Sequence, residues 1–234
     1  MSDQNNESLK RADEAKSLFL RTVSHDVRSP LTAVLSAAKL LEDDRGLDEA
    51  QRQQFVQMIV RNANRIRRLL DDVLDIERLT RGATIEPVLT EVDLEQLVAD
   101  VIDEINTQKR TITVDCQVKT IVADRMQVER TIYNLVGNAL KHTDSDITVC
   151  TFAEGDGTTI AVGDHSGGVP DDLKQEIFEP FKRATDGNTP GTGIGLSLVA
   201  EFARGHHGRA WVEDNDGGGS SFRVWFPHAE ADDF

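Results

Sequence analysis

Residues 55–76 read FVQMIVRNANRIRRLLDDVLDI, and the spacing of their apolar side chains determines the fold of this part of the chain. Seven positions recur at alternating steps of four and three residues, the heptad spacing of a helix that packs along a seam. They are Phe55, Ile59, Asn62, Ile66, Leu69, Val73 and Ile76. Charged residues off this seam include Arg61, Arg65, Arg68, Asp71, Asp72 and Asp75. The stretch therefore predicts one long amphipathic helix, with Asn62 as its only polar seam position.

The residues before this stretch predict a second helix of the same kind. Its apolar face is formed by Phe19, Val23, Val27, Pro30, Val34, Ala38 and Leu41. Gly46 is a helix-stopping residue between the two helices, and Asp48 is a candidate N-cap for the later one. Residues 1–82 thus predict a helical hairpin.

The predicted hairpin cannot enclose its own apolar face. We therefore expect two copies of the chain to form a dimeric four-helix bundle. The alternative is that the apolar stripe packs on the rest of this chain. The homodimer is favoured because both seams are longer than one small domain could cover.

One histidine of the earlier helix is a candidate for chemistry. His25 lies two residues after Val23 and off the seam, so its imidazole is expected to face solvent and to act as a nucleophile or proton carrier. Asp26 can hold one ring N–H and leave the other nitrogen free to attack. Pro30 removes a hydrogen bond from the Asp26 carbonyl and predicts a kink one turn after His25. A plain surface histidine is the alternative.

The pattern changes after Gly82. Residues 83–90 predict a linker, residues 91–228 an α+β domain, and residues 229–234 a disordered acidic tail. Helices are expected over 93–109, 125–142 and 195–205, and strands over 111–118, 146–152, 158–163, 210–213 and 221–226.

Three polar residues share one face of the predicted helix 125–142. Asn134, Asn138 and Lys141 lie at positions i, i+4 and i+7, and the apolar residues lie on the opposite face. Two amide oxygens and an ammonium in one stripe can hold a hydrated Mg²⁺ and a triphosphate together. An ordinary amphipathic helix with surface amides is the alternative.

Two glycine-rich segments flank the rest of the candidate site. Residues 164–169, DHSGGV, follow a strand, and residues 191–196, GTGIGL, precede a helix whose N-terminal N–H groups favour phosphate. The spacing excludes both a dinucleotide fingerprint and a P-loop.

Aromatic and basic residues lie between the glycine segments. Phe178 and Phe181 can anchor the intervening loop while Lys182 and Arg183 reach a phosphate. Core aromatics with solvated charges are the alternative.

Taken together and in this order, these segments resemble the signatures of two-component sensor histidine kinases, over about residues 10–228. The segment around His25 resembles the histidine box, and residues 134–141 resemble the asparagine box. The other three matches are a first glycine box at 164–169, a phenylalanine box at 178–181 and a second glycine box at 191–196. The resemblance implies a dimerisation and phosphotransfer hairpin followed by an α/β-sandwich ATP-binding domain of the Bergerat type, as in DNA gyrase and a class of heat-shock chaperones.

The resemblance also implies a reaction. ATP would phosphorylate His25 with Asp26 assisting proton removal, and the phosphoryl group would pass to an aspartate on a response-regulator receiver domain. Ser29 occupies the position, commonly Thr or Asn, that the family ties to phosphatase activity toward that regulator. Ser29 keeps a hydroxyl there, and phosphatase activity is left open.

The same resemblance assigns ATP and Mg²⁺ to the second domain. Asn134 and Asn138 would position Mg²⁺, Lys141 would contact phosphate, and Asp164 would read the adenine amino group. The further nucleotide contacts are His142, Gly168, Lys182, Arg183, Gly191, Thr192, Gly193, Gly195 and Leu196. Ser166 stands where the first glycine box usually has Gly, so less backbone freedom is expected there.

Other functions remain as alternatives. An ATPase of the same nucleotide-binding superfamily, or a Ser/Thr kinase of the anti-sigma-factor type, would leave the hairpin with His25 unexplained. A non-catalytic dimeric scaffold or pseudokinase is disfavoured by the intact Asn138, Lys141, Asp164 and glycines.

Composition indicates the setting of the 234-residue chain. Its net charge of −15 arises entirely in residues 83–234, so no basic surface for nucleic acid is expected. No apolar run has transmembrane length, and two cysteines without metal-ligand spacing indicate a reducing, cytoplasmic setting. An upstream sensor domain or sensor protein is compatible with the chain, as is a membrane anchor if the chain is a fragment.

Overall fold

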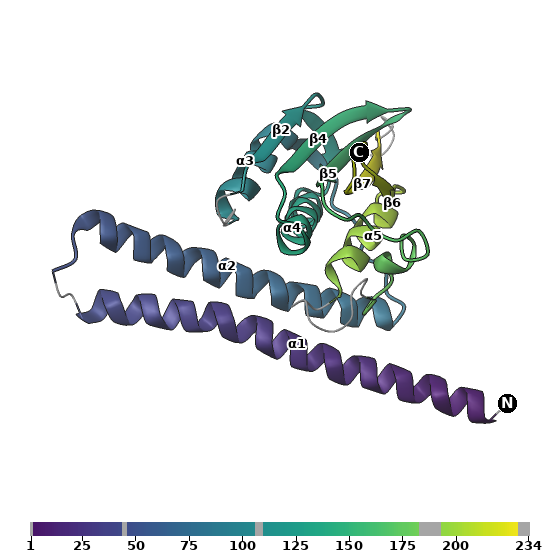
Figure 1. Ribbon diagram of the computed structural model, residues 1–234, viewed down its shortest axis with the longest axis horizontal. Helices are drawn as coiled ribbons and strands as arrows, with labels where there is room; N and C mark the ends of the chain where they lie inside the picture. Colours follow the sequence, from purple (N-terminus) through teal and green to yellow (C-terminus); the bar gives the residue numbers. More distant parts are fainter. Residues whose placement is uncertain (1, 44–45, 106–109, 183–192, 229–234) are drawn as a thin grey trace. The chain divides into compact units, whose positions relative to one another are not determined.

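The computed structural model describes residues 2–43, 46–105, 110–182 and 193–228, with side chains from Arg21 onward (Figure 1). The chain divides into two compact units, with the boundary between Leu74 and Asp75.

The first unit is the predicted helical hairpin. It consists of α1 (Ser2–Asp43) and most of α2 (Glu49–Thr80), which run antiparallel in Figure 1. The predicted cap at Asp48 is confirmed. The Gln51 N–H donates to Asp48 Oδ1 at 2.8 Å, and Gln51 Oε1 accepts from the Asp48 N–H at 3.0 Å. This reciprocal capping box specifies where α2 begins.

Side-chain burial in this unit follows the two predicted seams, except at one position of α1 that was predicted wrongly. From Val23 onward, the α1 seam residues are half-buried or buried, but Ala37 is buried and Ala38 is exposed. The heptad step of three after Val34 reaches Ala37, so the prediction of Ala38 was wrong by one residue.

A second apolar row of α2 is uncovered within this unit. Its residues are each about half exposed and repeat with the heptad, one position after the seam. They are Val56, Val60, Leu70 and Leu74, and Leu31, Leu35 and Leu40 are similarly exposed on α1.

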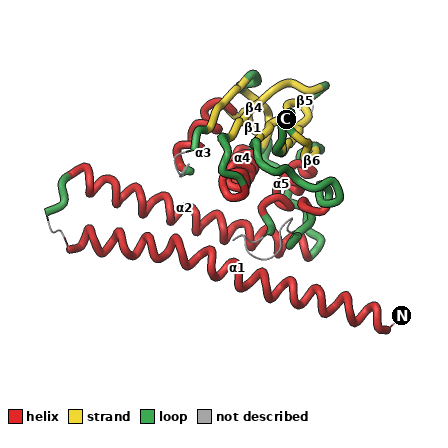
Figure 2. Tube along the Cα trace, viewed as in Figure 1, coloured by secondary structure: helices red, strands yellow, loops and turns green. Residues whose placement is uncertain are grey.

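The second unit is a two-layer α/β sandwich. Its main sheet has the strand order β2-β4-β5-β7-β6, in which β2 and β4 are parallel and the other pairs are antiparallel. The strands are β2 (Ile112–Cys116), β4 (Ile147–Glu154), β5 (Gly157–Gly163), β6 (Arg209–Asp214) and β7 (Ser220–Pro227). The helices α3 (Leu94–Glu104), α4 (Arg125–His142) and α5 (Gly195–Gly205) pack on one face of this sheet (Figure 2).

The core of this unit forms where the alternating apolar residues of the strands pack against the apolar face of a helix. Alternate residues of β4 and β7 point inward, as shown by the buried Ile147, Val149, Phe222 and Val224. The apolar face of α4 packs on them at helical spacing. That face consists of Val128, Ile132, Leu135, Val136 and Ala139.

The predicted α+β class and the elements of the main sheet are confirmed, with differences at the start of the unit. A small antiparallel pair, β1 (Thr90–Asp93) and β3 (Thr120–Ala123), was not predicted, and Thr90 begins β1 rather than ending the linker. Nor was the short 3-10 helix Glu176–Phe178 predicted. Such short elements carry too few residues to show a period. The last residues of the predicted helix 93–109 lie outside the described residues.

The end of α2 is part of the second unit. Asp75 and Ile76 are buried, and Asp75 Oδ2 accepts from Arg130 Nη1 of α4 at 2.5 Å. The Arg130 guanidinium also lies over the ring of Phe202 in α5, 4.8 Å from its centroid. Asp75 is therefore not a solvated charge beside the seam, as its position in the heptad suggested.

Candidate functional site

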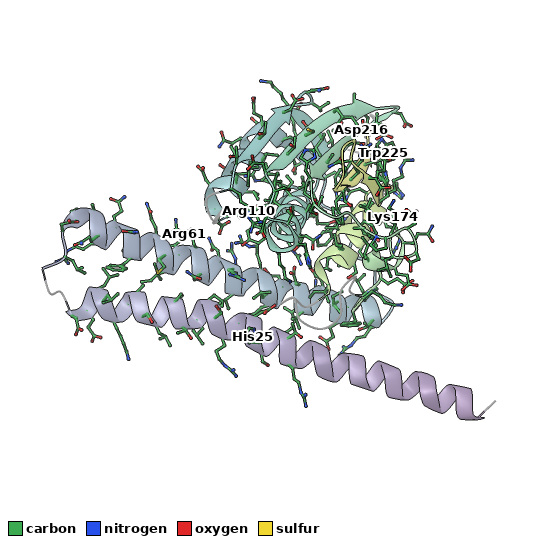
Figure 3. All side chains as sticks on the ribbon, viewed as in Figure 1. His25, Arg61, Arg110, Lys174, Asp216 and Trp225 are labelled. Carbon is green, nitrogen blue, oxygen red and sulfur yellow. The ribbon has the colours of Figure 1, made fainter. Side chains whose placement is uncertain are left out.

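His25 lies on the solvent-facing side of α1, as expected. Its side chain is 70% exposed, and its Nδ1 lies 3.3 Å from Asp26 Oδ1 (Figure 3). With the Nδ1–H donating to the carboxylate, the lone pair of Nε2 is the one available for attack. Ser29, one turn later, is also exposed. The helix α1 continues through the buried Pro30.

The predicted polar stripe is present on α4. Asn134 and Asn138 are half-buried, Lys141 and His142 are exposed, and the neighbouring Leu135 is fully buried. The stripe therefore faces away from the hydrophobic core.

Both ends of α4 are capped by side chains. Asp124 Oδ1 accepts from the Gln127 N–H at 3.0 Å at the N-terminus. At the C-terminus, the Arg110 guanidinium donates to the carbonyls of Leu140 and Thr143 (Figure 3). A cation at a helix C-terminus is favourable because it satisfies the last carbonyls and the dipole. These caps fix where α4 begins and ends, and therefore where along the helix the polar stripe lies.

Asp164 follows the last residue of β5 and is only 6% exposed. Its backbone is held by the start of β7, because the Asp164 N–H donates to the Ser220 carbonyl at 2.9 Å. Asn215 Nδ2 donates to the Asp164 carbonyl at 2.7 Å. A Cβ at Gly219 would lie 2.2 Å from that carbonyl oxygen, so this position requires glycine.

The carboxylate of Asp164 is also held. Its Oδ1 accepts from the Ser166 N–H at 2.8 Å and from the Ser166 hydroxyl at 2.6 Å. The loop then turns at Gly168, whose φ of 77° is in the left-handed region, and the Val169 N–H donates to Ser220 Oγ at 3.0 Å. The predicted first glycine segment therefore forms an ordered loop beside Asp164.

The second glycine segment reaches the polar stripe. The helix α5 begins at Gly195, as predicted, and its N-cap Ile194 makes no side-chain capping hydrogen bond. A Cβ at Gly195 would lie 3.2 Å from Asn134 Oδ1, so the helix start lies directly against Asn134. The structure thus brings an amide of α4 and the N–H groups of a helix N-terminus together, an arrangement that suits a phosphate.

The segment of Phe178 and Phe181 is hydrogen-bonded to the second glycine segment between backbone groups. The Phe181 N–H donates to the Gly193 carbonyl at 3.0 Å, and both residues have positive φ. Phe178 and Leu196 pack against the hydrophobic core.

The basic residues that were predicted to reach phosphate are not shown to do so: one pairs with acidic side chains and the other lies outside the described residues. Lys182 Nζ pairs with Glu176 at 2.9 Å and with Glu179 at 3.9 Å, and the hydrogen bond to Glu176 raises the pKa of the ammonium. Its contact with phosphate stays a prediction. Arg183, Gly191 and Thr192 lie outside the described residues.

The oxygen ligands of this site suit Mg²⁺ better than a transition metal. No cluster of three or more His, Cys, Asp or Glu side chains that could hold a metal occurs in the described residues. Asn134 and Asn138 offer amide oxygens, and Mg²⁺ usually completes such a set with water and substrate phosphates. The residues present therefore fit the predicted ion.

Sequence reasoning missed the residues that hold Asp164 and α4 in place. Asn215 and Gly219 support Asp164 from the connection between β6 and β7, Ser220 supports it from the start of β7, and Arg110 caps α4. The run Gly217-Gly218-Gly219 was a signal for a close backbone approach, since all three glycines have positive φ. Arg110 carried no comparable signal.

No helix within the described part of the chain combines the length and the hydropathy that crossing a bilayer requires.

Two family descriptions match the chain, one on each side of the linker. Residues 15–82 match the His Kinase A (phospho-acceptor) domain. Residues 123–230 match the histidine kinase-, DNA gyrase B- and HSP90-like ATPase family.

Curated relatives match nearly the whole chain. It is 32% identical to the sensor histidine kinase TmoS of Ectopseudomonas mendocina, over 94% of this chain and 24% of that protein. It is 30% identical to the adaptive-response sensory kinase SasA of Crocosphaera subtropica, over 94% of this chain and 62% of that protein. The chain thus spans between about a quarter and three fifths of the length of these relatives.

Solved structures agree with the fold. Full-length ShkA in complex with AMPPNP is 28% identical, with a TM-score of 0.61 over 94% of this chain and 46% of that one. The histidine kinase ThkA in complex with the response regulator TrrA is 21% identical, with a TM-score of 0.56 over 97% of this chain and 66% of that one. At that identity, the second likeness concerns the fold alone.

Proposed function

Because the chain belongs to the family of two-component sensor histidine kinases, we propose that it transfers the γ-phosphoryl group of ATP to His25. The observation that carries this proposal is the meeting of Asn134 and the start of α5 in the unit that also presents the buried Asp164. We assign residues 1–82 to the phosphotransfer hairpin, 83–89 to a linker, 90–228 to the ATP-binding domain, with Thr90 moved to the domain because it begins β1, and 229–234 to a tail.

The nucleotide would be held at both of its ends. The Asp164 carboxylate accepts a hydrogen bond from the adenine amino group, and the N–H groups at the start of α5 bind phosphate. Asn134 and Asn138 would hold Mg²⁺, which would supply charge neutralisation at the phosphates, and Lys141 would add a cation on the same face. Among the described residues, His142, Gly168, Gly193, Gly195 and Leu196 are further assigned nucleotide contacts, together with Lys182 once it leaves Glu176; Arg183, Gly191 and Thr192 are assigned from the sequence alone.

His25 would act as the nucleophile. Asp26 accepts the Nδ1–H, which leaves the Nε2 lone pair to attack the γ-phosphorus. The Nε2–P bond forms as the bond to the bridging oxygen of ADP breaks, and the proton on Nδ1 is then released to Asp26 or to solvent. Since positioning and charge neutralisation supply most of phosphoryl-transfer catalysis, no further covalent group is required.

The phosphoryl group would then move to an aspartate of a response-regulator receiver domain. Ser29 is exposed on the same helix, one turn from His25, and offers a hydroxyl that can orient water for phosphatase activity, the hydrolysis of the regulator's phosphoaspartate to aspartate and inorganic phosphate. We assign the protein to the cytoplasm, where ATP and such regulators are available, with an upstream sensor domain or protein supplying the stimulus.

The hairpin would work as a homodimer. The exposed residues Val56, Val60, Leu70 and Leu74 each lie one position after a seam residue, with Ala63 and Arg67 at the two positions between them, and a four-helix bundle would remove this row from water.

The test is incubation of the chain with γ-³²P-labelled ATP and Mg²⁺, comparing wild type with His25→Gln. We expect acid-labile, base-stable label on the wild type and none on the variant, because the substitution removes the nucleophilic nitrogen. Asn138→Ala should also abolish labelling while the chain remains a dimer by light scattering. Label on Ser or Thr, or label that survives His25→Gln, would contradict the proposal.

A further inference from the structure

We propose that Ser166 is a positioning residue that orients the Asp164 carboxylate for the exocyclic amino group of adenine. The inference rests on the proposed function, since it assumes that ATP is the ligand. It concerns one of the two positions at which this chain departs from its family, which usually has glycine there.

The two hydrogen bonds from Ser166 end on the same carboxylate oxygen. The backbone N–H and the hydroxyl both donate to Asp164 Oδ1, at 2.8 Å and 2.6 Å. Among the described residues, no group donates to Oδ2. Because Oδ1 is engaged twice, the carboxylate cannot rotate freely, and Oδ2 is the oxygen presented to a ligand.

The backbone of Asp164 is already immobile without Ser166. Its N–H and carbonyl are held by Ser220 and Asn215, and Gly219 packs against the carbonyl oxygen. The side-chain torsions are then the remaining freedom. A glycine at position 166 could supply the backbone N–H bond, but only a hydroxyl side chain adds the second bond.

The recognised group follows from the chemistry of the carboxylate. Oδ2 is an acceptor, and the 6-amino group of adenine is a donor, whereas guanine has a carbonyl oxygen at the same ring position. Asp164 is only 6% exposed, and its carboxylate loses its remaining contact with water when the base binds. A carboxylate oxygen that is misaligned with the amino group therefore lowers the binding affinity. Ser166 should therefore affect recognition of the amino group and not binding of the triphosphate.

The experiment measures dissociation constants by calorimetry for ATP and for purine riboside triphosphate, which lacks only the amino group. Wild type should bind ATP more tightly than the analogue. Ser166→Ala should weaken ATP binding roughly five- to tenfold, as expected for one misplaced hydrogen bond, and leave the analogue unchanged. Ser166→Thr keeps the hydroxyl and should retain ATP affinity.

The matched control is Ser221→Ala. Ser221 is buried on β7 next to Ser220, but its hydroxyl accepts from Arg223 Nε and not from the Asp164 loop. This variant should leave both dissociation constants unchanged.

Equal weakening of both ligands by Ser166→Ala would overturn the inference, because it would indicate a general disturbance of the loop. No change in ATP binding would overturn it as well. Wild type that binds neither nucleotide would contradict the proposed kinase function itself. Equal binding of both by wild type would remove only the role of Asp164 and Ser166 in reading adenine.

Discussion

His206 is a buried residue whose ionisation is linked to the folding of the second unit. It accepts a hydrogen bond at Nε2 from the Asp124 N–H at 2.9 Å and lies 2.7 Å, through Nδ1, from the Phe202 carbonyl. The geometry requires the neutral tautomer with hydrogen on Nδ1, since Nε2 must accept. Burial lowers the pKa of this imidazole below its ordinary value of 6.5, and the hydrogen bond to Phe202 opposes the shift only in part.

This linkage predicts a loss of stability in mild acid. Above pH 6.5 the imidazole is neutral in both the folded and unfolded states, so its contribution is complete. Below pH 6.5 the unfolded chain binds the proton first, so the free energy of unfolding falls until the lowered folded pKa is reached. Urea denaturation between pH 7.5 and 5.5 should show this slope in wild type, and a smaller slope in His206→Gln.

The control for this prediction is His228→Gln. His228 is exposed at the end of β7, so its removal should leave the pH slope as in wild type. Equal slopes for wild type and His206→Gln would contradict the linkage.

At the scale of elements, the last turn of α2 is attached to the second unit by a buried ion pair. Arg130 and Asp75 are both under 10% exposed, and Arg130 also packs on Phe202. This pair connects the end of α2 with α4 and α5, the two helices that carry the candidate site. The boundary between the two compact units therefore lies before Asp75 and not in the predicted linker.

Breaking this pair on one side should be strongly destabilising. Asp75→Ala leaves an uncompensated guanidinium in the interior, and we expect a loss of about 3–5 kcal/mol in the free energy of unfolding of the second unit. The double variant Asp75→Leu with Arg130→Met should be closer to wild type than either single change, because no charge is left buried. Chemical denaturation of wild type, Asp75→Leu, Arg130→Met and the double variant completes the double-mutant cycle.

An exposed arginine provides the comparison. Arg78 lies 3.7 Å from the same carboxylate but is 67% exposed. Since exposed ion pairs contribute little, Arg78→Ala should change stability by less than about 1 kcal/mol. If Asp75→Ala had an effect as small as Arg78→Ala, the ion pair would not be the attachment point.

At the scale of the whole molecule, the uncovered apolar row of α2 predicts the oligomeric state. Val60→Lys combined with Leu70→Lys places two charges in the proposed bundle interior, so the dimer should dissociate to monomers in sedimentation velocity experiments. The hairpin seam inside each chain is not altered by these changes.

The matched substitution is Gln57→Lys, which adds a charge at an exposed polar position of the same helix. It should leave the dimer intact. A wild-type chain that sediments as a monomer, or a dimer that persists in the double variant, would show that the row has another role.

Much of the fold was predictable because local spacing specifies it. The heptads predicted both hairpin helices, and Asp48, Arg125 and Gly195 mark helix starts that the structure confirms. The short strands β1 and β3 were missed because four residues show no period.

The candidate site also has a part that was predictable from the sequence and a part that was not. The chemistry of His25, Asn134, Asn138 and Asp164 could be inferred from residue type and motif order, since these depend on the chain alone. Their supports could not be inferred. Asn215 reaches Asp164 across 51 residues, and Arg110 reaches Leu140 across 30.

The sequence by itself thus determined the helical hairpin, the α/β sandwich and the family, and it predicted the residues expected to carry the chemistry. These features depend on side-chain period and on neighbours within about one helical turn. Only the tertiary structure decided that Asp75 is buried against Arg130, that His206 is neutral between two helices, and that Ser166 holds Asp164. Their ionisation and orientation depend on which distant groups exclude water from them, and packing alone determines that.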